Sequence, residues 1–222
     1  MGDEVLTLAT TGGRLWRVVR QPLTAFLAEL DGGPHECRLG GGTTVAARWR
    51  HRDSVDIDLT VSRGVSLYSM GTDFERATER LGGTVEFSVG RRKIDFGIGQ
   101  VDLAQLDPCP AGGQRTAVVD GGPFTVLSPA QILHGKLERA TRSPVRDVFD
   151  VIKAPRLDAE ALAIAINCKS RLEAETICVA REKSNAAFEK VVDEQLAGVP
   201  EAMRENPATL GDEGAAALQD AL

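Results

Sequence analysis

The sequence predicts an α+β protein, in which strands and helices are interspersed over residues 1–127 and residues 128–222 form a helical region that ends in a loosely held tail over residues 206–222. Two observations predict this class. The stretch Val55–Val61 places apolar side chains at every second position, as a half-buried strand does. Ser128-Pro129 opens a run with apolar residues at helical spacing, since serine caps a helix and proline fits its first position.

The composition predicts an ordinary globular protein. The 222 residues suffice for one large domain, with 42% hydrophobic and 26% charged residues. No apolar run approaches the roughly 18 residues of a membrane span, and the acidic start lacks an export signal. We therefore expect a cytoplasmic protein with no membrane partner. The four cysteines contain no CxxC pair, which argues against a zinc site and favours free thiols.

Charge is distributed unevenly. The formal net charge of −6 argues against a general nucleic-acid coat protein. Residues 155–222 hold 7 Lys and Arg against 13 Asp and Glu, so the whole negative excess lies there. Residues 1–154 are neutral overall, which is compatible with a phosphate-bearing substrate in that part.

Strands are predicted where β-branched and aromatic residues lie between glycine-rich breaks. They cover residues 5–8, 36–39, 55–61, 84–89, 93–98, 116–119 and 124–127. Gly90 and the turn Asp120–Pro123 join the last four into two hairpins. Residues 101–110 are expected to form a loop.

Helices are predicted where apolar residues recur every three or four positions behind a start signal. They cover residues 22–30, 43–50, 73–81, 129–140, 145–152, 158–167, 171–182 and 186–197. Pro22 is expected to open the first, and Gly82-Gly83 to stop the third. The alanine-rich segment after Leu157 matches no pattern that assigns it a role.

Two aspartates on the predicted strand indicate a metal site. Alternation puts Asp56 and Asp58 on one face and sends Val55, Ile57 and Leu59 into the core. Neighbouring carboxylates repel each other, and a divalent cation between them relieves this repulsion. Their hard oxygens suit Mg²⁺.

Further features extend this site. Gly41 and Gly42 precede a short helix, whose backbone N–H groups suit a phosphate. Asp95 supplies a third carboxylate on a neighbouring strand, and Lys136 and Arg139 share a helix face that suits phosphates. Such a set suits two Mg²⁺ ions across a nucleoside triphosphate, one activating an attacking hydroxyl and one at the leaving pyrophosphate.

Each feature also has a structural explanation. A glycine pair often forms only a tight turn, and alternating aspartates can mark a solvent-facing strand. Lys136 and Arg139 fit a solvated helix face, and Asp147 fits a surface ion pair with Arg142 or Arg146. The combination is what favours chemistry.

The combined residues resemble motif I of the nucleotidyltransferase superfamily that includes polymerase beta. The motif stands here as Gly41-Gly42-Thr43, a basic segment, and then Arg52-Asp53-Ser54-Val55-Asp56-Ile57-Asp58-Leu59. More narrowly, the chain resembles the AbiEii/AbiGii-type toxins of bacterial toxin–antitoxin systems. That part of the resemblance rests on Lys136-Leu137-Glu138-Arg139 followed by Arg146-Asp147-Val148-Phe149-Asp150. It covers about residues 35–153.

The resemblance implies a nucleotidyltransferase-like mixed sheet flanked by helices, with a helical C-terminal region. The sheet domain would span residues 1–127, and residues 128–222 would form the helical region, whose part 128–153 completes the active site. The family implies Mg²⁺-dependent transfer of NMP from an NTP to RNA, typically at the 3′ acceptor end of tRNA. Blocked translation would follow, and an antitoxin protein would be a further partner.

The resemblance also implies residue roles. The catalytic residues would be Asp56, Asp58, Lys136 and Asp147. The nucleotide would be bound by Gly41, Gly42, Thr43, Lys136, Arg139 and Asp150. Metal would be held by Asp56, Asp58 and Asp95. RNA phosphates would be met by Arg48, Arg50, Arg52, Arg91, Arg92 and Lys93. Gly42 stands where many superfamily members have serine, so Thr43 would have to supply the missing hydroxyl.

Two other functions remain open at the level of sequence. The acceptor could be a protein hydroxyl or a small molecule such as an antibiotic, because no acceptor-pocket signature stands in the chain. Alternatively, the chain could be a catalytically inactive module that only binds nucleotide. The sequence does not select one of the four NTPs.

Overall fold

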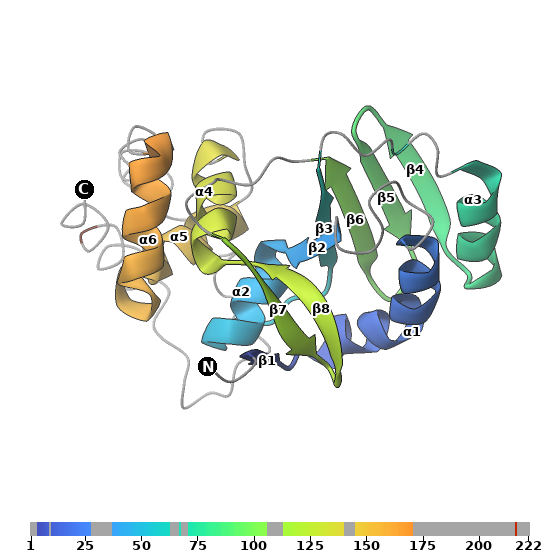
Figure 1. Cartoon of the computed structure of the whole chain (residues 1–222), viewed down its shortest axis with the longest axis horizontal. Helices are drawn as coiled ribbons and strands as arrows, with labels where there is room; N and C mark the ends of the chain where they lie inside the picture. The colour runs from blue at the N-terminus through green and yellow to red at the C-terminus, as the bar shows by residue number, and fades with distance from the viewer. Residues whose placement is uncertain are drawn as a thin grey trace. The chain divides into compact units, whose positions relative to one another are not determined.

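The computed structural model describes residues 4–8, 10–27, 37–62, 67, 71–105, 113–139, 145–170 and 216 (Figure 1). The helices predicted over 171–182 and 186–197 lie outside these residues. The chain forms two compact units. The first comprises Met1–Arg48, Ser54–Asp107 and Gln114–Leu127, and the second comprises Trp49–Asp53, Pro108–Gly113 and Ser128–Leu222.

The first unit contains one mixed sheet. Its strands are β1 (Glu4–Leu6), β2 (Cys37–Gly40), β3 (Ile57–Val61), β4 (Thr84–Ser88), β5 (Arg91–Asp95), β6 (Gln100–Gln105), β7 (Gln114–Val119) and β8 (Gly122–Leu127). The eight strands lie in the order β1-β7-β8-β2-β3-β6-β5-β4. The pairs β1–β7, β2–β8 and β3–β6 are parallel, and the others are antiparallel. This architecture confirms the predicted α+β class with a mixed sheet.

Helices accompany the sheet and form the described part of the second unit. The first unit holds α1 (Thr10–Leu27), all but the last residue of α2 (Gly41–Trp49), and α3 (Gly71–Arg80). The second unit holds α4 (Pro129–Arg139), α5 (Val145–Leu157), α6 (Ala159–Ala165) and the π-helical segment Ile166–Ser170. No described helix is long and apolar enough to cross a membrane.

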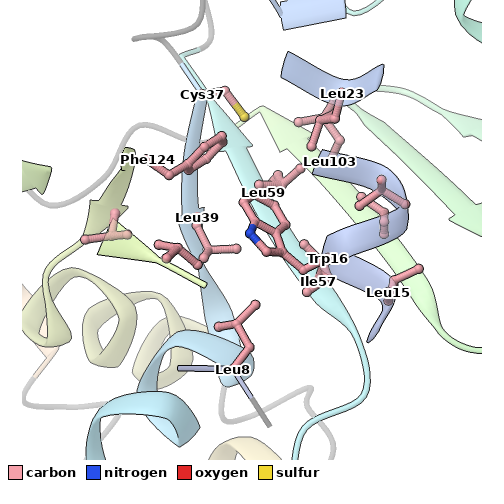
Figure 2. Close-up of a cluster of buried hydrophobic side chains, with 14 of the residues drawn as sticks. Leu8, Leu15, Trp16, Leu23, Cys37, Leu39, Ile57, Leu59, Leu103 and Phe124 are labelled. Atoms are coloured by element: carbon pink, nitrogen blue, oxygen red, sulfur yellow. The ribbon is translucent and has the colours of Figure 1, made fainter. Parts of the chain in front are cut away.

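The core of the first unit forms between α1 and the sheet. Leu15, Trp16, Val19 and Leu23 make one apolar stripe on α1, and all four are buried. Figure 2 shows the indole of Trp16 among the strand side chains. Its ring meets that of Phe124 edge-on, with centroids 5.0 Å apart. Each such side chain contributes roughly 1.5–3 kcal/mol by burial.

A separate core holds the helices of the second unit together. Leu133 and Leu137 of α4 pack with Phe149 of α5 and Leu162 of α6, and all four are at most 1% exposed. The carboxylate of Asp158 caps α6 by accepting a hydrogen bond from the Ala161 amide at 3.1 Å. The second unit therefore has its own apolar core, and the first turn of α6 is stabilised by a side-chain cap within the same unit.

Three local predictions were wrong. The first helix begins at Thr10, not Pro22, because burial of its apolar stripe outweighs the low helix propensity of the two glycines in its first turn. Residues 100–105 form β6 and not a loop, since Val101 and Leu103 alternate with polar residues and are buried. Val55 is 41% exposed and precedes β3, so it does not join the core.

The cysteines differ in state. Cys37 is free and buried, and burial raises the pKa of its thiol to about 12. Cys168 is disulfide-bonded, so the expectation of free thiols is wrong for this residue.

Candidate active site

The glycine turn lies directly against Asp58. β2 ends at Gly40 and α2 begins at Gly41 without an intervening loop, and Gly40 is the antiparallel register partner of Asp58. The amide of Gly42 donates to Oδ2 of Asp58 at 3.1 Å. Because a helix N-terminus carries partial positive charge, it attracts negatively charged groups placed there.

Position 41 accepts only glycine for two reasons. Gly41 has φ +62°, a left-handed backbone conformation that other residues adopt at a cost. A Cβ at this position would also overlap the carboxyl group of Asp58. The close approach of backbone and carboxylate is therefore built into the turn.

Thr43 faces the interior of the first unit. It is 1% exposed, and its hydroxyl lies 2.9 Å from that of Ser54 and donates to the carbonyl oxygen of Asp56. The hydroxyl thus ties α2 to the segment that leads into β3. In this structure it is engaged there and is not presented to solvent.

Asp56 and Asp58 are both half-buried, whereas Ile57 and Leu59 between and beyond them are at most 1% exposed. Asp56 is the last residue before β3, and Asp58 is the second residue of the strand. Both acids are thus partly open to solvent, as ligands of a metal or substrate have to be.

A third carboxylate beside this pair belongs to Asp102, which the sequence reasoning missed. β3 and β6 are parallel neighbours, and Asp58 is in register with Asp102. Register partners share a sheet face and lie about 5 Å apart between strands. Arg91 binds the Asp102 carboxylate with two nitrogens, Nε to Oδ1 at 2.6 Å and Nη2 to Oδ2. The hydrogen bond to Asp102 chiefly raises the pKa of Arg91, and the charges of Asp102 and Asp58 add to this.

Asp95 occupies a different place. It ends β5, and β6 lies between that strand and β3, so the structure does not make it a neighbour of Asp58. Its exposed carboxylate accepts from the Gly97 amide at 2.7 Å and from Nε2 of Gln100 at 3.3 Å. These two bonds, the first above all, lower the pKa of Asp95. The geometry assigns it to the β5–β6 turn.

The carboxylate oxygens of this region suit a divalent cation, although the side chains do not converge on one point. Among the described residues, no three acidic, histidine or cysteine side chains are arranged to hold a metal as they stand. Asp58 is turned to the Gly42 amide, and Asp102 is turned to Arg91. Asp58 and Asp102 on the adjacent strands β3 and β6, and Asp56 just before β3, nevertheless supply the hard carboxylate oxygens that Mg²⁺ prefers.

A second group of charged residues is buried in the second unit. Lys136 Nζ lies 2.5 Å from Oδ1 of Asp147 and 2.9 Å from Oδ2 of Asp150. Asp150 also accepts from Nε2 of His51 at 2.7 Å, from Nε of Arg52 at 2.7 Å and from Nη2 of Arg52 at 2.8 Å. We call these five residues the Asp150 cluster. His51 is the member for which the sequence suggested no role in the site.

The Asp150 cluster keeps its charges because they are paired. Burial opposes the charge of Asp150, but Lys136 and Arg52 outweigh it and hold the pKa of that carboxyl well below its usual value. Burial likewise opposes the charge of Lys136, yet Asp150 and Asp147 raise its pKa on balance. For His51, burial dominates and lowers the pKa, so the ring is neutral at pH 7.

The predicted RNA-binding residues differ in accessibility. Arg92 is 3% exposed and donates to the Leu67 carbonyl at 2.8 Å, and the Arg52 side chain is buried in the Asp150 cluster. Arg48 is bound to Glu4 and to the Leu127 carbonyl. The more accessible residues are Arg50 and Arg91, which are exposed, and Lys93, which is half-buried. Arg139 is the last residue of α4, and its side chain is not among those that the structure describes.

Comparison with known proteins gives one matching family. The model of the family described as "Nucleotidyl transferase AbiEii toxin, Type IV TA system" matches residues 25–219. No curated protein sequence matches the chain.

Solved structures share the fold. JHP933 from Helicobacter pylori aligns with a TM-score of 0.55 and 13% identity, over 96% of this chain and 93% of that one. A second solved structure, described as that of a nucleotidyltransferase from H. pylori, aligns with a TM-score of 0.55 and 15% identity, over 96% of each chain. The antibiotic-resistance factor ANT(2'')-Ia aligns with a TM-score of only 0.45 and 20% identity, over 82% of this chain and 99% of that one. This similarity is too distant to indicate which acceptor the present chain uses.

Proposed function

The chain belongs to the AbiEii family of nucleotidyltransferase toxins, and we propose that it is a Mg²⁺-dependent enzyme that transfers NMP from an NTP to RNA. The acceptor that we propose is the 3′ end of tRNA, which is the acceptor implied by the resemblance of the sequence motifs to this family. The family belongs to a type IV toxin–antitoxin system, so an antitoxin is the expected partner.

The observation that carries this proposal is the contact between Asp58 and the Gly41-Gly42 turn. It joins a carboxylate to the start of a helix, where a phosphate group is favoured. We propose that Asp56, Asp58 and Asp102 hold the metal, with Asp102 in place of the Asp95 that the sequence suggested. A divalent cation bound there would supply positive charge that offsets charge developing on the phosphates.

The chain's own residues would orient the substrate. The first amides of α2 would direct the triphosphate, and Asp58 would remain fixed by the Gly42 amide or by metal. Lys136 stays our proposed phosphate-binding residue. Because Lys136 is 2% exposed, it would have to exchange one carboxylate partner for a phosphate oxygen, and Asp147, whose side chain is 12% exposed, is the less deeply buried of the two. Arg139 is retained on the family resemblance alone.

Accessible basic residues support RNA as the acceptor. Lys93 is in register with Asp102, which is in register with Asp58, so all three share one sheet face. Arg91 lies on the same face of the same strand, two residues away. We propose that Lys93, Arg91 and Arg50 contact RNA phosphates. Arg48, Arg52 and Arg92 are left out, because their guanidinium groups are engaged inside the protein.

The test is a transfer assay with each of the four labelled NTPs, Mg²⁺ and total tRNA. We expect label on tRNA with wild-type protein and none with Asp58→Asn, whose amide oxygen still accepts from Gly42. Parallel reactions with cell protein and with aminoglycosides as acceptors address the other two acceptor classes. Absence of transfer to tRNA, or equal transfer by Asp58→Asn, would contradict the proposal. Growth arrest on induction of wild type, but not of Asp58→Asn, tests the toxin assignment.

A further inference from the structure

The segment Trp49–Asp53 has an unusual position in the chain. It belongs to the second unit, although the residues before and after it, Arg48 and Ser54, belong to the first. Three positions after it comes Asp56, and two further on Asp58. Whatever fixes this segment therefore fixes one end of the chain that carries the proposed metal ligands.

Asp150 is the residue that holds the segment. Three of the four polar contacts of its carboxylate come from two consecutive residues of the segment, His51 and Arg52, and the fourth comes from Lys136. Arg52 makes the bidentate contact that fixes a guanidinium in both position and orientation. Its Nη1 also donates to the carbonyl of Asp53 at 2.9 Å, which restrains the backbone at the end of the segment.

Aromatic packing orients the imidazole of His51. The ring stacks on Phe149 with centroids 5.6 Å apart and an interplanar angle of 20°. Trp49 meets it edge-on at 5.4 Å. Phe149 is adjacent to Asp150 on α5, so one helix turn supplies both the carboxylate and the stacking surface. The segment is thus held by polar and by apolar contacts from the same helix.

We propose that Asp150 is a positioning residue for nucleotidyl transfer: it holds Arg52 and His51, and through them the chain that leads into Asp56 and Asp58. This inference rests on the proposed metal role of those two aspartates. It replaces the direct nucleotide contact that the family resemblance implied for Asp150. The carboxylate is 0% exposed, and each of its oxygens already has two polar partners, so no side of it is open to a substrate.

The test compares Asp150→Asn with Asp158→Asn. Asp158 is a matched control, because it also lies in the second unit and also loses a structural hydrogen bond, at the cap of α6. Hydrogen exchange of the peptide covering residues 49–58 is measured in both. We expect exchange of this peptide to rise at least about tenfold in Asp150→Asn and to match wild type in Asp158→Asn.

Kinetics separate positioning from simple loss of stability. Per folded molecule, we expect kcat of Asp150→Asn to fall about 10- to 100-fold, as for other residues that orient metal ligands, while KM for NTP changes less than about threefold. Asp158→Asn keeps wild-type kcat per folded molecule. Arg52→Lys retains the charge but loses the bidentate fork, so it should give the same defect in milder form.

A double variant tests the route of the effect. If Asp150 acts through Arg52, Asp150→Asn with Arg52→Lys lowers kcat no further than Asp150→Asn alone. Multiplicative effects on kcat, or unchanged kcat per folded molecule, would overturn the inference. If Asp150→Asn does not fold, the same measurements of hydrogen exchange and kcat on Arg52→Lys test the inference. If wild-type protein transfers no nucleotide, the proposed function fails, and the exchange comparison alone then decides whether Asp150 holds the segment.

Discussion

Asp102 of β6 stands in parallel register with Asp58 of β3, on the same face of the sheet. This pairing predicts which acid completes the proposed metal site. We expect Asp102→Asn to raise the Mg²⁺ concentration needed for half-maximal transfer by at least about tenfold. Asp95→Asn should change it less than about twofold, because Asp95 is bound to its own turn. Mg²⁺ titrations of both variants, with thermal melting as a control for folding, provide the measurement. The reverse order of effects would restore Asp95 as the third carboxylate.

Replacement of Gly41 by alanine should abolish transfer. Gly121 provides a matched control, since it also has a positive φ, +85°, but has open space around its Cα. Gly121→Ala should cost only the backbone penalty of about 1–2 kcal/mol and retain activity. Gly41→Ala should cost more and displace Asp58, because the new methyl group overlaps that carboxyl group. Urea unfolding and transfer assays compare the two. Equal behaviour of both variants would mean that the Gly41–Asp58 approach is unimportant.

The Asp150 cluster should make stability depend on pH in the acid range. The folded-state pKa of Asp150 is well below its ordinary value, so its contribution is present above the unfolded pKa of about 3.9 and is lost as pH falls below it. At pH 7, Asp150→Asn should lose about 3–5 kcal/mol of unfolding free energy, as expected when a buried ion pair is broken. The difference from wild type should shrink progressively below about pH 4. Urea titrations at several pH values measure it, and parallel curves for the two proteins would contradict the expectation.

Lys93 should contribute to RNA affinity through charge. Lys93→Gln removes a positive side chain in the same register row as Asp102 and Asp58. We expect weaker tRNA binding and a slope of log affinity against log salt that is less steep by about one. Arg80→Gln, at the exposed end of α3, is the control and should leave the slope unchanged. If Lys93→Gln also leaves the slope of log affinity against log salt unchanged, Lys93 does not contact the RNA phosphates.

Local sequence signals were sufficient for much of the fold, and they indicated the acids and glycines of the candidate site. Strand alternation indicated β3, and the Ser128-Pro129 start indicated α4, because these signals act within a few residues. The adjacency of Gly41 and Gly42 to a helix start is equally local. Such signals could not exclude an extension of α1 back to Thr10, which depends on burial against the sheet.

What only the tertiary structure decided is which distant residues meet. Asp102 is a neighbour of Asp58 because β3 pairs with β6. The register of two strands cannot be deduced from the sequence of either strand alone. Arg52 was predicted to contact RNA phosphates, yet it is buried against Asp150 together with His51, about a hundred residues away. The charge of Arg52 was visible in the sequence, but whether a charge faces solvent or a buried partner depends on packing. The sequence by itself therefore determined the chemical groups of this protein, and the tertiary structure determined which of them are open to a substrate.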